Sequence, residues 1–144
     1  MIVDIPKFGL IAWCWLGCCH VVWGAEAADA PPPRSLEFQA VSVAGQEIGL
    51  TRQTGRQLTV VCFLATECPL ARLYASRLEE LHRAYREQGV RFVGIDSNRQ
   101  DSIAEIQDFV REHRLSFPFV KDVDNRVADQ YGAVRTAEVF VIDQ

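Results

Sequence analysis

The segment VVCFLATECPLARLY, residues 60–74, contains the clearest structural signal in this chain, because an apolar run stops there and a helical pattern begins. Residues 60–64 are continuously apolar, which is typical of a strand buried on both faces of a mostly parallel sheet. Pro69 is well suited to the first turn of a helix, so Cys68 lies where strand gives way to helix. The spacing after Pro69 predicts a buried helix face made of Leu70, Leu73, Tyr74, Leu78, Leu81 and Tyr85.

Cys68 occupies a position that favours a thiolate over a thiol. Unpaired N–H groups and the helix dipole concentrate positive potential at the start of a helix. Arg72, one helical turn further on, is expected to lower the pKa of the thiol, whereas Glu67 is expected to raise it. We expect a net lowering, which makes Cys68 a candidate nucleophile. The alternative is that Cys68 is a small buried apolar residue.

The segment FLATECPLA, residues 63–71, resembles the strand, loop and helix of the thioredoxin superfamily, in which a nucleophilic cysteine opens the first long helix. GVRFVGIDSN and FPFVKDVDNRVADQYGAVRTAEVFVID, residues 89–98 and 117–143, resemble the redoxin branch, the alkyl hydroperoxide reductase and thiol-specific antioxidant (peroxiredoxin-like) domains of the exported bacterial type. The resemblance implies an α/β, thioredoxin-like fold over residues 36–144, with a central mixed β-sheet flanked by helices.

The end of the sequence lacks a counterpart to the last edge strand and the C-terminal helix of that fold, so we expect a domain truncated at its C-terminus. The fold would place residues 139–142 (VFVI) antiparallel beside the central strand, residues 58–64. The outer edge of residues 139–142 would then be open and apolar, which invites pairing with another chain. We therefore expect self-association through this edge.

Several positions depart from the superfamily pattern. The second cysteine of a Cys-x-x-Cys motif would fall at Ala71, and the Thr or Ser and the Pro found before the peroxiredoxin nucleophile correspond to Ala65 and Val61. Ala137 stands where most thioredoxin-like domains have a cis-proline. Because a cis peptide before alanine is costly, we expect a trans and locally reshaped loop there.

These features predict a single-cysteine thiol oxidoreductase, in which Cys68 attacks a peroxide or a disulfide and an external thiol resolves the product. For peroxide chemistry, Thr66 and Arg135 are the candidate donors to the departing oxygen, although Arg135 also fits an ordinary surface charge. The alternative is a redox-inert, thioredoxin-like binding module or a fragment of a longer protein of the export compartment. The thiol pKa of Cys68 distinguishes the two hypotheses, since an unshifted value favours the second.

Composition and the N-terminus suggest an exported domain. The chain has 144 residues and a net charge of −4, which leaves no basic surface for nucleic acid. Residues 1–27 are typical of a signal peptide, with residues 8–23 as an N-terminal membrane anchor in the alternative, and residues 28–35 form a proline-rich spacer. Cleavage after residue 27 leaves Cys62 and Cys68 as the cysteines of the mature chain. We expect no cofactor and no metal site.

The remaining pattern predicts the secondary elements around the cysteine. We expect Cys62 to be buried, His82 to be a solvated surface group and His113 to be structural. Asn98 is expected to lie near the site at the end of a parallel strand. The predicted elements are a pair of short strands (36–43 and 48–50), a first helix (69–88), a second strand (90–95), a capped second helix (102–114), an extended segment (117–120) and a short third helix (124–131).

Overall fold

The structure, a computed structural model, describes residues 36–50 and 58–143. The predicted signal peptide or anchor (1–27) and the spacer (28–35) lie outside the described residues. The elements in chain order are β1 (Phe38–Val41), β2 (Glu47–Leu50), β3 (Leu58–Phe63), α1 (Pro69–Tyr85), η1 (Arg86–Gln88), β4 (Arg91–Asp96), α2 (Ile103–Glu112), β5 (Phe119–Lys121), η2 (Val123–Asn125), α3 (Arg126–Tyr131) and β6 (Glu138–Asp143).

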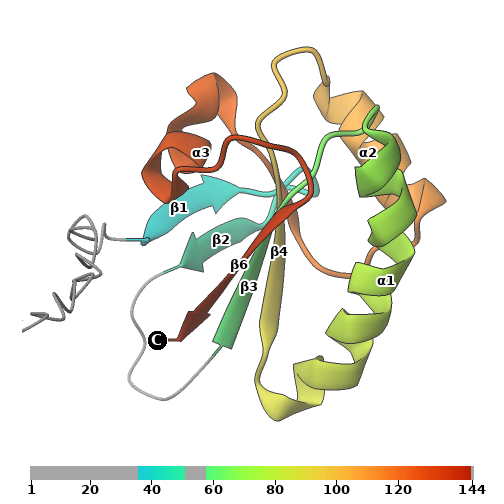
Figure 1. The fold of residues 1–144 in the computed structure, drawn as a ribbon, viewed down its shortest axis with the longest axis vertical. Helices are drawn as coiled ribbons and strands as arrows, with labels where there is room; N and C mark the ends of the chain where they lie inside the picture. The colour runs from blue at the N-terminus through green and yellow to red at the C-terminus, as the bar shows by residue number, and fades with distance from the viewer. Residues whose placement is uncertain (1–35, 51–57, 144) are drawn as a thin grey trace, which may run out of the picture. The chain divides into compact units, whose positions relative to one another are not determined.

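A four-stranded mixed sheet in the order β5-β4-β3-β6 forms the centre of the domain (Figure 1). Strands β3, β4 and β5 run parallel, and β6 runs antiparallel to β3, with Val141 opposite Val60. Strands β1 and β2 form a separate antiparallel hairpin. The predicted α/β fold with a mixed sheet, the N-terminal strand pair and the antiparallel last strand are confirmed.

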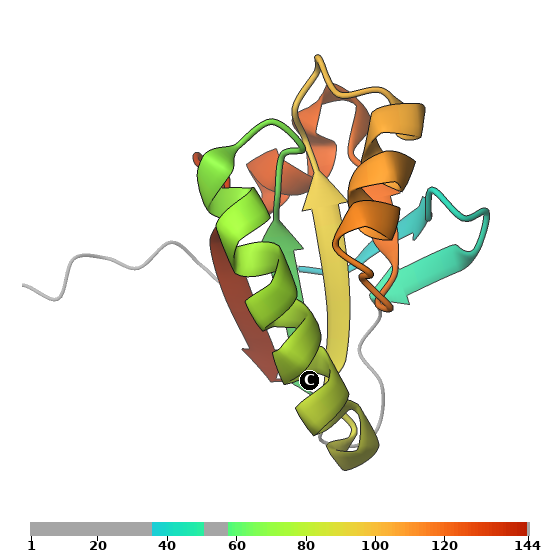
Figure 2. The ribbon, with the colours of Figure 1, turned by 90° about the vertical axis from the view of Figure 1, so that its right-hand side faces the viewer.

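The side chains of β3 pack alternately against two apolar layers. Val60 and Cys62 face the core that α1 and α2 complete, whereas Val61 and Phe63 face the core completed by α3 and the β1–β2 hairpin. Figure 2 shows α1 and α2 lying over one face of the sheet. Because both faces of β3 are covered here, residues 60–64 are continuously apolar. Cys62 is fully buried as expected, and burial raises the pKa of its thiol to about 12.

Helix α1 turns a different face to the sheet from the one predicted. Its buried residues include Ala71, Ala75 and Leu78, while the apolar residues exposed on the helix are Leu70, Leu73, Tyr74 and Tyr85. The predicted face was therefore wrong for these four side chains. The small alanine side chains let the helix backbone approach the sheet closely, and the bulkier residues on the neighbouring row are then left outside.

Polar groups of α1 also enter the core. The carboxylate of Glu79 is buried and accepts hydrogen bonds from the N–H (2.8 Å) and the hydroxyl (2.7 Å) of Ser116. The ring of His82 packs edge-on against Phe92 and Phe117, with centroids 5.4 and 5.6 Å away, and burial lowers its pKa. The expectation of a solvated His82 was wrong, because His82 continues the inward-facing row one turn beyond Leu78.

The helix ends follow the sequence signals. Gly89 ends η1 in a left-handed conformation (φ 83°), and Ser102 and Glu105 form the predicted capping box of α2. His113 is the C-terminal cap residue of α2, in agreement with its predicted structural role. Within residues 36–50 and 58–143, no helix is both long and apolar enough to cross a membrane.

Strand β6 has one partner among the described strands. It pairs with β3, and the side chains of Val139 and Val141 are 47% and 65% exposed. In the described part of the chain, the other edge of β6 is therefore unpaired, as predicted, and two exposed valines lie on one face of the strand.

Candidate active site

Cys68 lies at the N-terminal cap of α1, where the chain leaves β3 and turns into the helix. Its backbone is extended (φ −77°, ψ 121°), Pro69 opens the helix, and the thiol is half-buried. The turn that leads to it is closed by a hydrogen bond from the Cys68 N–H to the carbonyl oxygen of Ala65 (3.2 Å). A cysteine at this position meets the free N–H groups of the first helical turn.

The surroundings of the sulfur lower its pKa. The backbone N–H of Ala71 has the largest effect, and the Leu70 N–H and the Thr136 hydroxyl add to it, against a smaller opposing effect of burial. The thiol forms no close cap hydrogen bond, so these donors act as a group of dipoles around the sulfur. The predicted activation of Cys68 is confirmed in direction, and the alternative of a fully buried apolar residue is wrong.

Arg72 contributes differently from the prediction. Its guanidinium forms an ion pair with Glu112 of α2 (2.6 Å) and donates a hydrogen bond to the carbonyl oxygen of Thr66 (3.3 Å). The lowering of the thiol pKa comes from the helix N–H groups and Thr136 instead. Arg72 therefore ties the turn before Cys68 to α1 and α2, while its charge is already paired.

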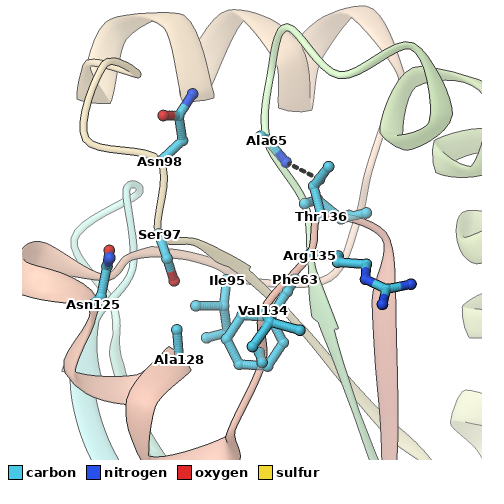
Figure 3. A pocket seen from close by; sticks show the side chains of 12 residues that line it. Phe63, Ala65, Ile95, Ser97, Asn98, Asn125, Ala128, Val134, Arg135 and Thr136 are labelled. Atoms are coloured by element: carbon cyan, nitrogen blue, oxygen red, sulfur yellow. Dashed lines mark hydrogen bonds between the residues drawn. The ribbon is translucent and has the colours of Figure 1, made fainter.

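Thr136 is a site residue that the sequence interpretation missed. Its hydroxyl oxygen accepts a hydrogen bond from the Ala65 N–H (3.0 Å), which joins the loop before β6 to the turn before Cys68 (Figure 3). The same hydroxyl favours the Cys68 thiolate. The available signal was its place directly before Ala137, the position of the superfamily proline.

Thr66 and Arg135 stand in different relations to the thiol. Thr66 is buried, and its N–H donates to the carboxylate of Asp101 (2.7 Å). In Figure 3 the Arg135 side chain points away from Ser97 and Asn98. The backbone N–H of Arg135 donates to the Glu138 carboxylate (3.4 Å). Thr66 thus belongs to the turn before Cys68, and Arg135 to the loop before β6. Their predicted role as donors to a departing oxygen stays a prediction.

A cavity of about 380 Å³ lies beside the reactive turn. Ala65 and Thr136 line it on the side of the turn, and Asn98 lines it from the end of β4, near the site as expected (Figure 3). Cys68 is not among the lining residues, but Thr136, whose hydroxyl lowers the pKa of Cys68, is. The other residues that line it are Phe63, Leu64, Ile95, Ser97, Asn125, Ala128, Ala133, Val134 and Arg135.

Ala137 has a backbone that a proline could not adopt. Its φ is 64°, and its N–H donates to the carbonyl oxygen of Phe63 (2.6 Å). Proline fixes φ near −65° and has no N–H. The expected reshaping of this loop is confirmed, whereas the predicted trans peptide stays a prediction. No group of three His, Cys, Asp or Glu side chains in residues 36–50 and 58–143 is arranged to hold a metal ion.

Known proteins share this fold and sequence pattern. Over 99 residues the chain is 30% identical to the thiol-disulfide oxidoreductase ResA of Halalkalibacterium halodurans, a match that covers 69% of this chain and 54% of ResA. It is 21% identical over 143 residues to sporulation thiol-disulfide oxidoreductase A of Bacillus subtilis, which covers 99% of this chain and 81% of that protein. The chain thus spans about half the length of the ResA protein that it matches.

The solved structures agree with this relationship. A hypothetical protein, SMc02350 from Sinorhizobium meliloti 1021, superposes with a TM-score of 0.69 at 26% identity, over 76% of this chain and 63% of that one. StoA from Bacillus subtilis superposes with a TM-score of 0.65 at 19% identity, over 74% and 79% of the two chains, which shows the fold alone. The family model of the AhpC/TSA family matches residues 31–144. The chain therefore belongs to the AhpC/TSA family, with a thioredoxin-like fold.

Proposed function

We propose that this protein is a single-cysteine thiol oxidoreductase that acts through Cys68. The observation that carries the proposal is a half-buried thiol with a lowered pKa at the start of α1, with Ala71 at the position of a second cysteine. Ala71 is fully buried and directs its N–H toward the sulfur, so this position supports the thiolate and supplies no resolving thiol.

The proposed reaction is thiol–disulfide exchange. The Cys68 thiolate attacks one sulfur of a substrate disulfide, the S–S bond breaks, and the departing thiolate takes a proton from water. An external thiolate then attacks the Cys68 sulfur of this mixed disulfide and releases the second substrate thiolate, and another external thiolate attacks the new mixed disulfide and releases the Cys68 thiolate. Two external thiols in sequence supply the two electrons that reduce the substrate, and they leave as a disulfide.

Disulfide exchange fits the site better than peroxide reduction. Peroxide reduction requires donors to the departing oxygen, and the Thr66 N–H is already used by Asp101. Disulfide exchange requires only an accessible thiolate and a leaving thiol. The names of the thiol-disulfide oxidoreductase relatives also support this assignment.

Site-resolved mass spectrometry on the full chain tests the proposal. Cys68 should react with a neutral alkylating reagent at pH 7 faster than a free cysteine peptide, and it should form a mixed disulfide with oxidised glutathione. Cys68→Ser should abolish both reactions, whereas the control Cys62→Ser should leave them unchanged because Cys62 is buried. An unreactive Cys68 would support the redox-inert binding module instead. Rapid sulfenic acid formation with micromolar peroxide, trapped by a sulfenate reagent, would favour the peroxidase alternative.

We propose an extracytoplasmic location for the domain. The support is the apolar N-terminal segment with its small-residue cleavage motif, together with a thioredoxin-like neighbour described as a secreted disulfide oxidoreductase of Mycobacterium tuberculosis. An external thiol of that compartment would then be the reductant.

A further inference from the structure

Two buried carboxyl groups lie together beneath the turn that leads to Cys68. Asp96, at the end of β4, is fully buried, and Asp101, in the loop before α2, is 4% exposed. One oxygen of Asp101 accepts the Thr66 N–H (2.7 Å) and the other accepts the Asn98 side-chain N–H (2.8 Å). Asp96 Oδ1 accepts from the Lys121 ammonium (3.1 Å) and from the Asn98 backbone N–H (3.0 Å).

The two carboxyl groups influence each other's pKa. Asp96 Oδ2 is buried and has no donor among the described groups. Burial, followed by the hydrogen bond with Asp101, raises the pKa of Asp96 to about 7. Burial also acts to raise the pKa of Asp101, but the hydrogen bonds from Asp96 and Thr66 outweigh it and lower that pKa. Opposite shifts in adjacent carboxyls are the pattern expected of a pair that holds one proton on Asp96 and donates it to Asp101.

Asp101 contacts the reactive turn at its centre. Thr66 precedes Cys68 by two residues, and the Cys68 N–H closes the same turn on Ala65. The carbonyl oxygen of Thr66, in the next peptide unit, accepts a hydrogen bond from the Arg72 guanidinium. A displacement of the Asp101 carboxylate therefore moves the peptide that sets the position of the Cys68 sulfur.

We propose that Asp101 is a positioning residue for the Cys68 turn, and that the proton held between Asp96 and Asp101 controls how firmly it holds the Thr66 peptide. This inference rests on the proposed role of Cys68 as the reactive thiol. With the proton present, the pair carries one negative charge, which Lys121 balances. Without it, two adjacent carboxylates repel each other, Asp101 shifts against Thr66, and an added negative charge disfavours the nearby thiolate.

Several other charged groups face the pair. Lys121 comes from β5 and Glu105 from the first turn of α2, while Arg72 of α1 binds the Thr66 carbonyl oxygen of the turn above the pair. The N–H of Ser102 lowers the pKa of Glu105, so Glu105 is ionised throughout the neutral range. The buried carboxylate of Asp122, at the start of η2, accepts hydrogen bonds from N–H groups of α3 and from the Ser97 hydroxyl.

The test compares the wild-type chain with Asp96→Asn and with Asp108→Asn between pH 5 and 9. Asparagine reproduces the shape and the donor of the protonated acid but cannot lose the proton, whereas Asp108 is an exposed carboxylate on α2 that pairs with Arg111. Alkylation of Cys68 by iodoacetamide should be about threefold faster in Asp96→Asn than in the wild type at pH 8, and equal at pH 5.5. Asp108→Asn should follow the wild type.

A second measurement reads the positioning directly. In the wild type, the NMR amide resonance of Thr66 should titrate with a midpoint near neutral pH, and in Asp96→Asn this titration should disappear. Equal alkylation profiles of wild type and Asp96→Asn, or a Thr66 amide that does not titrate in the wild type, would overturn the inference. If Asp96→Asn does not fold, the pH titrations of the Thr66 amide and of the ¹³C carboxyl resonances of Asp96 and Asp101 in the wild type test the inference. An unreactive Cys68 would refute the proposed function, while the Thr66 titration would still test the carboxyl pair.

Discussion

Replacing Asp96 by asparagine should change how the stability of the domain depends on pH. The pKa of Asp96 is raised from 3.8 to about 7, so the folded chain keeps a proton between pH 4 and 7 that the unfolded chain has lost. The stability contributed by the protonated acid is complete below pH 4 and is lost as the pH rises through 7. Each pH unit in this range costs about 1.4 kcal/mol per proton.

The wild type should therefore lose about 2 to 3 kcal/mol from this group between pH 5 and pH 8, and Asp96→Asn should not. The pH dependence of wild-type stability hides part of this loss, because burial also lowers the pKa of His82. His82 makes the folded chain less stable as the pH falls, whereas Asp96 makes it more stable. The difference between variant and wild type cancels the effect of His82. Urea unfolding at pH 5 and pH 8 measures that difference.

The matched control for this measurement is Asp108→Asn, which removes an exposed carboxylate. Its free energy of unfolding should differ from that of the wild type by the same amount at both pH values. A difference between Asp96→Asn and the wild type that is constant within about 0.5 kcal/mol would refute the raised pKa of Asp96. It would also show that Asp96 and Asp101 do not share a proton in the folded chain.

Three further changes test the site and the sheet edge. Thr136→Val should slow the alkylation of Cys68 at pH 7, because it removes a hydroxyl that favours the thiolate; an unchanged rate would exclude that role. Ala71→Cys should form an internal disulfide with Cys68 under oxidising glutathione, and a persistent dithiol, measured by mass, would contradict the thioredoxin-like placement of Cys68. Val141→Lys should reduce self-association in sedimentation experiments, because it places a charge on the exposed face of β6, beside the unpaired edge. A wild-type chain that is a monomer at tens of micromolar would argue against that edge as an interface.

The junction between β3 and α1 was predictable because its signals are local. A continuous apolar run indicates a strand covered on both faces, and Pro69 marks the first turn of a helix. Together they place Cys68 among free N–H groups without any knowledge of distant residues. The capping box of α2 and the glycine after η1 are local signals of the same kind.

The inward face of α1 and the partners of the reactive turn were not predictable in this way. Two rows of residues on α1 are compatible with burial, and hydrophobicity favours the row with Leu73, whereas close packing on the sheet selects the row with Ala71. Thr136 and Asp101 reach the turn from 71 and 35 residues away along the chain. A proton shared by two aspartates leaves no mark in a sequence, since it depends on burial and mutual distance.

The conformation of Ala137 means that the proline of related folds cannot be introduced here by a single substitution. A single Ala137→Pro substitution would remove the hydrogen bond to the Phe63 carbonyl and would require a φ of opposite sign. The loop would first need other changes that release this hydrogen bond and move Thr136 away from Ala65. The alanine loop and the proline loop therefore differ by more than one substitution.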